Sequence, residues 1–530
     1  MKFGIIDISI FAIYCVLVIG LGLWISRDKK GVKKDSKDYF LASKALPWWA
    51  VGASIIASNI SAEQFIGMSG SGFAIGLGIA SYEFMAALGL VIVAVFFLPI
   101  YIKNKVYTMP QFLEQRFDKR VKTTMAIFWL AVFIFVNLTS VLYLGALVIR
   151  TVMGLDMIWG IVGLALFAAI YSIYGGLKAV AWTDVIQVVF LIGGGLVTTY
   201  VAFELLGDGS FMAGVKDMWA QVGPASDNNR FDMILDKSHP SYMDLPGISV
   251  LIGGMWIANL YYWGCNQYII QRALAAKSLD HAQRGMVFAG ILKLFIPLIV
   301  VVPGIIALVL VKNGQLSGIN VADDAYPALL AQLPAGVKGL AFAALVAAVV
   351  SSLASMLNSV STIFTLDIYK AYIDKTASET RLVKTGRLSS IAALLIAAFV
   401  APLLGTLDQA FQFIQEFTGF VSPGVLAIFL AGFFYKRATA NGALAAAIGT
   451  FVLSFAFKFF FPGLPFMDRM GIIFVLCLLI IIAVSLFEKK GRGESKAIVV
   501  DRSLFKTSTA FKIWTVVIMI ALAAIYTMWW

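Results

Sequence analysis

Apolar stretches of roughly 20 residues recur along the whole chain and are separated by short polar connections. Wound as an α-helix, a stretch of this length crosses a hydrocarbon core about 30 Å thick. Hydrophobic residues make up 60% of the 530 residues and charged residues only 13%, proportions that a water-soluble fold cannot bury. The pattern therefore predicts an all-α polytopic membrane protein.

We expect a single membrane domain, residues 1–530, because no shift in composition and no Ser/Pro-rich linker divides the chain. About fourteen transmembrane helices are expected. Two of them are separated by little more than Gly405. In chain order the predicted spans are 5–26, 46–72, 77–102, 121–150, 157–174, 181–206, 245–271, 278–311, 336–369, 386–405, 407–434, 439–459, 469–487 and 511–529.

The basic residues indicate the orientation of the helices, since positive charge is retained on the cytoplasmic side of short loops. The first connection, residues 27–45, is rich in Lys and Arg, so we expect it in the cytoplasm and both termini on the outer side. The other loops that this assignment places in the cytoplasm also carry most of the remaining Lys and Arg residues, which agrees with it. The net charge of +12 therefore reflects topology and contact with anionic lipid. A nucleic-acid partner is disfavoured, because the basic residues are scattered among many loops.

The sequence offers little for enzymatic chemistry. It contains no GxxxxGK[ST] phosphate loop, which disfavours a pump driven by ATP. Cys15, Cys265 and Cys477 are dispersed among apolar helices and support neither a disulfide framework nor a metal site. The two histidines, His239 and His281, fall in connections or at the very start of a span, so no imidazole is expected inside the membrane. We therefore expect no enzyme and no cofactor, and energy from an ion gradient unless transport is passive.

Two membrane helices carry polar residues at mid-span. The second helix has Ser58 to Gln64 at its centre, and the seventh has Asn259 to Gln267. A charged residue at mid-bilayer costs roughly 2.5–3.5 kcal/mol on insertion scales, and unwound backbone is tolerated there only where it lines a cavity. We therefore predict interruptions near Asn59 and Asn259, with a binding site between them.

The two interruptions are five helices apart, which is typical of transporters built from two inverted five-helix repeats. This spacing assigns residues 46–206 to the first repeat and 245–434 to the second. The helix at 5–26 and the three helices in 439–529 then lie outside the core. The alternative is that these polar residues only hydrogen-bond between packed helices, as Ser, Asn and Gln commonly do in membranes.

Five long motifs follow one another along the chain: NISAEQFIGMSGSG at 59–72, YSIYGGLKAVAWTDVIQ at 171–187, ANLYYWGCNQYIIQRALAAKS at 258–278, AALVAAVVSSLASMLNS at 343–359 and FQFIQEFTGFVSPG at 411–424. Together they resemble the sodium:solute symporter family, and within it the sodium/glucose branch. The resemblance covers nearly the whole chain. It implies a leucine-transporter-type fold, alternating access, and sodium and sugar bound near the bilayer midplane.

The same resemblance implies the residues that contact the sugar, and their donors and acceptors suit a neutral polyol. Tyr262 is expected to stack beneath the sugar as the inner gate, and Ala86 stands where the most similar members have Ser. Lys293 has an alternative role as the partner of a carboxylate. The expected substrate-binding residues are Gln64, Glu83, Asn259, Lys293 and Gln415, and the expected gate residues are Met68, Tyr82, Tyr262, Trp263 and Phe411.

Sodium is a hard cation that prefers oxygen ligands. The resemblance implies a site made from the hydroxyls of Ser351 and Ser352 and the carbonyls of Ala57, Ile60 and Ala348. Asp184 is expected on the sodium pathway. Family members that use a second sodium tend to have Ser at position 354, where this chain has Ala, so one sodium per sugar is expected. Taken alone, the paired serines also suit simple helix packing.

The resemblance thus implies a secondary active transporter that takes up a monosaccharide, galactose or glucose, with sodium across the cell inner membrane. Its expected partners are sodium ion, the sugar and the lipid bilayer. The alternatives are a sodium- or proton-coupled symporter of another small solute, such as an amino acid, inositol or sialic acid. A passive channel and a transport-like sensor are further rivals, although no attached signalling domain is apparent.

Overall fold

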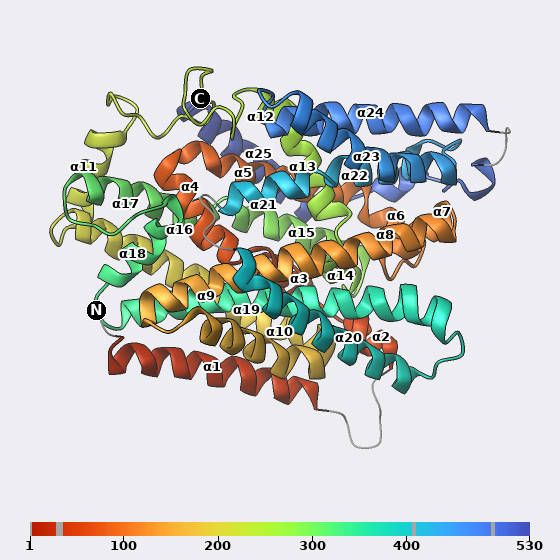
Figure 1. Cartoon of the computed structure of the whole chain (residues 1–530), viewed down its shortest axis with the longest axis horizontal. Helices are drawn as coiled ribbons and strands as arrows, with labels where there is room; N and C mark the ends of the chain where they lie inside the picture. The colour runs from red at the N-terminus through yellow and green to blue at the C-terminus, as the bar shows by residue number, and fades with distance from the viewer. Residues whose placement is uncertain (1–2, 28–34, 405–409, 489–492) are drawn as a thin grey trace.

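The computed structural model describes residues 3–27, 35–404, 410–488 and 493–530. These residues are almost entirely helical, and the one isolated β-bridge among them pairs Leu46 with Ala276. Most of the long helices run along the long axis of the molecule and pack side by side (Figure 1). Part of the predicted basic loop, 28–34, and the predicted boundary at Gly405 lie outside the described residues.

The helices follow the predicted order, with shorter pieces where a span is broken. Three segments are π-helical: η2 Glu63–Met68, η4 Phe133–Leu138 and η6 Phe364–Ile373. The α-helices are α1 Ile5–Ser26, α2 Ser36–Leu41, α3 Trp48–Asn59, α4 Ser69–Ala74, α5 Ser81–Phe96, α6 Leu98–Lys103, α7 Met109–Arg116, α8 Lys119–Val132, α9 Thr139–Met153, α10 Met157–Leu206, α11 Phe211–Val222, α12 Ser249–Ile252, α13 Gly254–Gly264, α14 Gln267–Leu274, α15 Leu279–Lys293, α16 Ile296–Val300, α17 Val302–Lys312, α18 Ala325–Gln332, α19 Val337–Ile363, α20 Glu379–Val400, α21 Ala410–Gly419, α22 Ser422–Phe434, α23 Ala440–Phe460, α24 Phe466–Phe487 and α25 Thr509–Met528.

Within the described residues, ten helices are long and apolar enough to cross a membrane. The number becomes eleven if the bent pair Leu279–Lys293 and Ile296–Lys312 is one span. The prediction of about fourteen also counts the shorter helix Met157–Ile170 and the two interrupted helices. The two interrupted helices escape a count based on length because breaks divide them into short pieces, and Met157–Ile170 escapes it because it is shorter than 18 residues.

The first predicted interruption lies where expected. Helix α3 ends at Asn59, and Ile60 is extended, with φ −79° and ψ 117°. The side chain of Gln64 stabilises the break, because its Oε1 accepts hydrogen bonds from the Ser61 amide (2.9 Å) and the Ser61 hydroxyl (3.1 Å). A backbone donor freed at mid-span is thus satisfied inside the protein, as an apolar environment requires.

The second interruption lies later in the predicted segment than Asn259 itself. Helix α13 runs unbroken through Asn259 to Gly264, and the chain unwinds at Cys265 and Asn266 before α14 begins. Asn259 is compatible with a regular helix because its amide donates to the Met255 carbonyl one turn earlier, at 3.0 Å. At the break, the Tyr101 hydroxyl donates to the Gly264 carbonyl at 2.8 Å.

Two other predicted spans are also broken, which the sequence reading missed. The predicted helix 278–311 bends by 44° after Lys293, close to Pro297. Proline removes one backbone donor and clashes with the preceding turn, so a bend at this point has a clear cause. The predicted helix 407–434 unwinds at Phe420 and Val421, between α21 and α22.

The predicted helices 157–174 and 181–206 are joined in the structure. They form α10, which is kinked at Gly176, where φ is +68° and ψ −165°. A Cβ atom at this position would lie 2.5 Å from the Tyr39 carbonyl oxygen. Both the backbone conformation and the close approach therefore require glycine.

Helix α19 is buried along nearly its whole length and packs against α10, α1 and α3. Both chain termini lie toward the end of the bundle that carries α11 and α18, whereas α2 and α7 lie toward the opposite end (Figure 1). At the first end, the 207–244 connection contacts the C-terminus, since the Met233 amide donates to the Trp529 carbonyl at 2.9 Å. Helix α11 within this connection was not predicted.

Candidate functional site

A cavity of about 70 Å³ lies where the first break meets α5, α13, α15 and α21. All five residues expected to bind substrate line this cavity: Gln64, Glu83, Asn259, Lys293 and Gln415. Four of the expected gate residues, Tyr82, Tyr262, Trp263 and Phe411, line it as well, and so does Ala86. Met68 is fully buried but is not part of the cavity wall.

Glu83 and Lys293 form a buried ion pair across the cavity. Their side chains are 4% and 1% exposed, and the Lys293 ammonium donates directly to the Glu83 carboxylate. The ammonium also lies 5.3 Å from the centre of the Trp263 ring, within range of a cation–π interaction. The carboxylate partner considered for Lys293 is therefore Glu83, another residue of the expected sugar site. Breaking such a pair leaves a buried charge uncompensated, so the two side chains hold each other in place.

The amides in the cavity wall are oriented by their own helices. Asn259 accepts a hydrogen bond from the Trp263 indole, with Nε1 and Oδ1 3.1 Å apart. The carbonyl end of Gln64 is held by Ser61 at the first break. Among the described residues no hydrogen bond occupies Gln64 Nε2, which leaves this group as a donor for a ligand.

Tyr262 connects the two broken helices. Its hydroxyl accepts a hydrogen bond from Asn59 Nδ2 at the end of α3 (2.9 Å) and another from the Tyr268 hydroxyl in α14 (2.5 Å). The Tyr262 ring packs edge-on against Trp263, with centroids 4.9 Å apart. The sequence reading missed Tyr268, although its place six residues after Tyr262, just past the break, was a usable signal.

On another side of the cavity, Tyr82 and Phe411 pack edge to face with ring centroids 5.0 Å apart. Phe411 sits directly on Gly67 of the first broken helix, where an added Cβ would lie 2.6 Å from the Phe411 Cβ. This contact lets the aromatic pair pack against the interrupted segment.

Several polar side chains in the cavity wall were not assigned to substrate. Glu63 accepts a hydrogen bond from the Ser140 hydroxyl at 2.8 Å, which ties the first broken helix to α9. Asn137 and Asn266 also line the cavity. The sequence reading missed Asn137, because it lies in the π-helical segment η4, where no helix interruption was expected.

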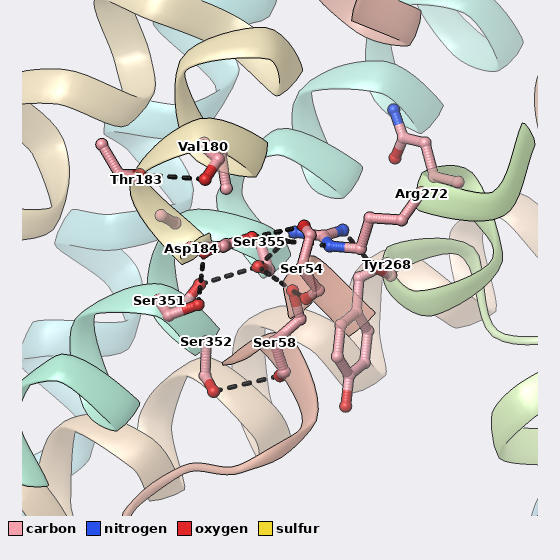
Figure 2. A network of polar contacts seen from close by, with 12 residues as sticks. Ser54, Ser58, Val180, Thr183, Asp184, Tyr268, Arg272, Ser351, Ser352 and Ser355 are labelled. Carbon is pink, nitrogen blue, oxygen red and sulfur yellow. Dashed lines mark hydrogen bonds and ion pairs between the residues drawn. The ribbon is translucent and has the colours of Figure 1, made fainter. Parts of the chain in front are cut away.

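Two of the residues expected to bind sodium, Ser352 and Ile60, meet beside the first break, and Figure 2 shows Ser352 there next to Ser58. The Ser352 hydroxyl lies 3.0 Å from the Ser58 carbonyl oxygen and 3.3 Å from that of Ile60. Ala57 and Ala348 are fully buried in α3 and α19, the two helices that meet here. Hydroxyl and carbonyl oxygens of this kind suit sodium.

Ser351 points to a different partner, Asp184 in α10. The Ser351 hydroxyl donates to Asp184 Oδ1 at 2.6 Å, and the Ser54 hydroxyl donates to Oδ2 at 2.5 Å. Asp184 is fully buried, so these hydroxyls and a nearby cation compensate its charge. Asp184 thus contacts Ser351, the residue next to Ser352 in α19, and its place on a sodium pathway stays a prediction.

The cation beside Asp184 is Arg272, whose side chain is 0% exposed. Its Nε lies 4.0 Å from Asp184 Oδ2, and its guanidinium also donates to the Ser355 hydroxyl and the Tyr268 carbonyl (Figure 2). Ser355 donates to the Ser58 hydroxyl at 2.8 Å. A polar network therefore links α14, which follows the second break, to α19 and the first break. The sequence reading missed Arg272, which stands alone at the end of an apolar span.

No group of three or more His, Cys, Asp and Glu side chains placed to hold a metal occurs in ranges 3–27, 35–404, 410–488 and 493–530. The oxygen cluster around Ser352 has a different composition, since it consists of neutral hydroxyls and carbonyls. Such a cluster matches a weakly held monovalent ion better than a structural divalent metal.

Comparison with known proteins places these features in a family. Residues 39–449 match the family described as the sodium:solute symporter family. The sodium/glucose cotransporter of Vibrio parahaemolyticus is 54% identical over 540 residues, covering 99% of this chain and 98% of the relative. The sodium/myo-inositol cotransporter 2 of Mus musculus is 36% identical, covering 83% of this chain and 68% of the relative. Sodium/glucose cotransporter 1 of Ovis aries is 32% identical, covering 91% and 79%.

The fold also matches a solved structure. A Na⁺-coupled sialic acid symporter in a substrate-bound outward-open state superposes with a TM-score of 0.77 at 24% identity, covering 92% of this chain and 99% of that one. At this identity the similarity concerns the fold alone. Together with the interrupted helices, it confirms the predicted leucine-transporter-type fold.

Proposed function

Because the chain belongs to the sodium:solute symporter family, as its motifs predict, we propose that it moves a monosaccharide, galactose or glucose, into the cell together with sodium. It is a transporter and not an enzyme. One observation carries the proposal: the five polar side chains expected to bind sugar line one cavity, and the break that supplies Gln64 also supplies the carbonyls next to Ser352.

The chemistry of the cavity suits a neutral polyol. Glu83 is an acceptor, Lys293 is a donor, and the amides of Gln64, Asn259 and Gln415 offer both functions. Each net hydrogen bond contributes about 1 kcal/mol, and more where a charged group takes part. Tyr262 and Trp263 add aromatic faces for the apolar side of a sugar ring.

Sugar binding requires the cavity to expand. Its volume of about 70 Å³ holds only a few water molecules, each of which occupies about 30 Å³ in the liquid. Glu83 and Lys293 line this space and contact each other directly, so hydroxyl groups of the sugar would take over part of the hydrogen bonding of both charges. A cavity that opens to one side of the membrane at a time is what alternating access requires.

Coupling is proposed to reside at the first break. Sodium held by Ser352 and the carbonyls of Ala57, Ile60 and Ala348 would hold α19 against α3 and so fix the position of Gln64 for sugar. We propose one sodium per sugar. One charge that crosses 100 mV supplies about 2.3 kcal/mol, enough for roughly fifty-fold accumulation before the sodium concentration gradient is added.

We further propose that residues 46–206 and 245–434 form the two inverted repeats, with both termini on the outer side of the cell inner membrane. Both termini lie toward the same end of the bundle, which supports their position on one side of the membrane (Figure 1). Labelling of single cysteines introduced next to Asp208 and Lys436 with an impermeant reagent tests it. Labelling of intact cells at the first position only is the expected outcome.

Uptake by purified protein in proteoliposomes tests the function. Labelled galactose or glucose should accumulate only when an inward sodium gradient is present, and Lys293→Ala and Ser352→Ala should both impair uptake. Accumulation driven by a proton gradient in the absence of sodium would contradict the proposal. Normal transport by both variants would contradict it as well. Unlabelled myo-inositol belongs in the competition panel, because a relative named for this polyol is 36% identical. If myo-inositol competed more strongly than unlabelled galactose or glucose, myo-inositol would be the preferred substrate.

A further inference from the structure

A second and larger hollow lies on the outside of the bundle. It has a volume of about 1000 Å³ and is formed by α20, by η6 and by the junction of α8 with η4. We call it the α20 groove. Leu130, Ile134, Phe364, Leu388 and Ile396 supply most of its apolar wall, and Arg381 and Lys384 lie at one end.

The groove has the length of one bilayer leaflet. Lys384 and Ile396 are twelve helical residues apart on α20, about 18 Å at a rise of 1.5 Å per residue. Half of a hydrocarbon core is about 15 Å thick. The apolar part of the groove lies along a membrane-spanning helix, so hydrocarbon fills it more favourably than water. Its size therefore suits an acyl chain.

The basic end of the groove suits a phosphate. The Arg381 side chain is 64% exposed, and its Nε donates to the Tyr369 hydroxyl at 2.8 Å and lies 3.4 Å from Asp374. These contacts orient the guanidinium at the mouth of the groove, and its other nitrogens remain as donors. Lys384 is exposed, and no ion pair involves it among the described residues. Hydroxyls of Ser378, Thr380 and Thr385 line the same end.

We propose that the α20 groove binds one anionic phospholipid, with an acyl chain along α20 and the phosphate at Arg381 and Lys384. A basic site at the end of an apolar intramembrane groove selects a lipid by its charge, whereas the apolar wall alone accepts any lipid. The wall segment η6 continues α19, the helix of Ser351 and Ser352. The bound lipid therefore contacts the end of the helix on which the hydroxyls beside the first break are placed. This site is independent of which solute the protein carries.

Native mass spectrometry of the full chain in detergent tests the proposal. Dioleoyl-phosphatidylglycerol is added at the same concentration as dioleoyl-phosphatidylcholine, and the fraction of protein with one bound lipid is measured. We expect several-fold higher occupancy by the anionic lipid. In Arg381→Gln/Lys384→Gln this occupancy should fall roughly ten-fold, since each basic residue near the headgroups contributes to the attraction. Lys384→Gln alone should have an intermediate effect.

Two matched controls test whether lipid occupancy depends on the groove itself. One controls for the total charge of the protein, and the other for the size of an added side chain. Lys436→Gln/Lys512→Gln removes the same charge from exposed positions outside the groove and should leave occupancy unchanged. Ala392→Trp fills the groove without altering its charges and should reduce occupancy as strongly as loss of the basic pair. Leu395→Trp places the same ring on the lipid-facing side of α20, outside the groove, and should have no effect.

Equal occupancy by the two lipids, or an unchanged occupancy in Arg381→Gln/Lys384→Gln, would overturn the proposal. The proposal would also be overturned if Ala392→Trp and Leu395→Trp lost the same share of lipid occupancy. Thermal melting of each variant without added lipid shows whether it is folded. If the double basic variant failed to fold, Lys384→Gln and the tryptophan pair would still decide the question.

Discussion

The side-chain amide of Asn59, the last residue of α3, donates a hydrogen bond to the hydroxyl of Tyr262 in α13 at 2.9 Å. The same hydroxyl accepts a hydrogen bond from Tyr268, on the far side of the second break. One phenol thus joins both interrupted helices below the proposed sugar cavity. Movement of either helix must change these hydrogen bonds, which is what a gate residue requires.

Loss of the Tyr262 hydroxyl should weaken the inner gate. In Tyr262→Phe two hydrogen bonds are lost, each with a net contribution of about 1 kcal/mol, while the ring contact with Trp263 is kept. We expect bound sugar to dissociate roughly 5–30-fold faster, measured as release of labelled sugar from protein held in sodium. Tyr242→Phe, in the 207–244 connection, is the control. Equal release rates for both variants would argue against a gating role.

The Glu83–Lys293 pair should show strong coupling between its members. Lys293→Ala leaves a buried carboxylate unpaired, a change that destabilises proteins by about 3–5 kcal/mol. We expect a clear loss of thermal stability in detergent and no uptake. The double variant Glu83→Gln/Lys293→Met should recover much of the stability, because no buried charge remains, but it should not recover transport. Additive losses of stability would show that the pair is not energetically coupled.

Ser352→Ala should weaken sodium coupling more than sugar binding. The variant removes one oxygen next to the Ser58 and Ile60 carbonyls. We expect the sodium concentration at half-maximal uptake to rise about five- to ten-fold, as loss of about 1 kcal/mol implies. The sugar KM at saturating sodium should change little. Ser359→Ala, a buried hydroxyl on the same helix that bonds Gln271, should leave the sodium dependence unchanged. A rise confined to the sugar KM would refute the assignment.

Arg272 should be required as the cation of the buried network. Arg272→Gln leaves Asp184 with hydroxyl donors only, so we expect a substantial loss of thermal stability. Arg272→Lys keeps the charge but loses the planar fork that reaches Ser355 and the Tyr268 carbonyl, and should be intermediate. Pairing Arg272→Gln with Asp184→Asn should restore stability. No recovery in the pair would mean that Arg272 acts mainly through its other contacts.

Ala86→Ser should change sugar preference. Ala86 lines the cavity and lies in α5 three residues after Glu83, so the new hydroxyl would face the ligand. One added hydrogen bond to a sugar hydroxyl is worth about 1 kcal/mol, which corresponds to a roughly five-fold change in the ratio of galactose to glucose uptake. Uptake of the two sugars in competition measures this ratio. A ratio that stays constant would exclude Ala86 as a determinant of specificity.

Much of the fold could be predicted because membrane insertion leaves a strong local signal. An apolar run of fixed length, followed by a polar connection, shows in the sequence without any knowledge of neighbours. The breaks were found for the same reason: polar residues such as Asn59 and Gln64 have no reason to occupy a lipid-facing position. The bend after Lys293 escaped notice, since prolines inside an apolar run, here Pro297 and Pro303, do not reveal whether the helix bends.

The sequence by itself determined that this chain crosses the membrane many times, that two helices are interrupted, and which side chains carry donors and acceptors. It also determined the family, through motifs that keep their order. Only the tertiary structure decided which partners meet: that Lys293 pairs with Glu83, that Ser352 reaches the Ser58 carbonyl while Ser351 turns to Asp184, and that Arg272 is buried beside them. Helix periodicity fixes the face on which a residue lies, but residues far apart in sequence meet only when helices pack, and packing depends on every side chain between them.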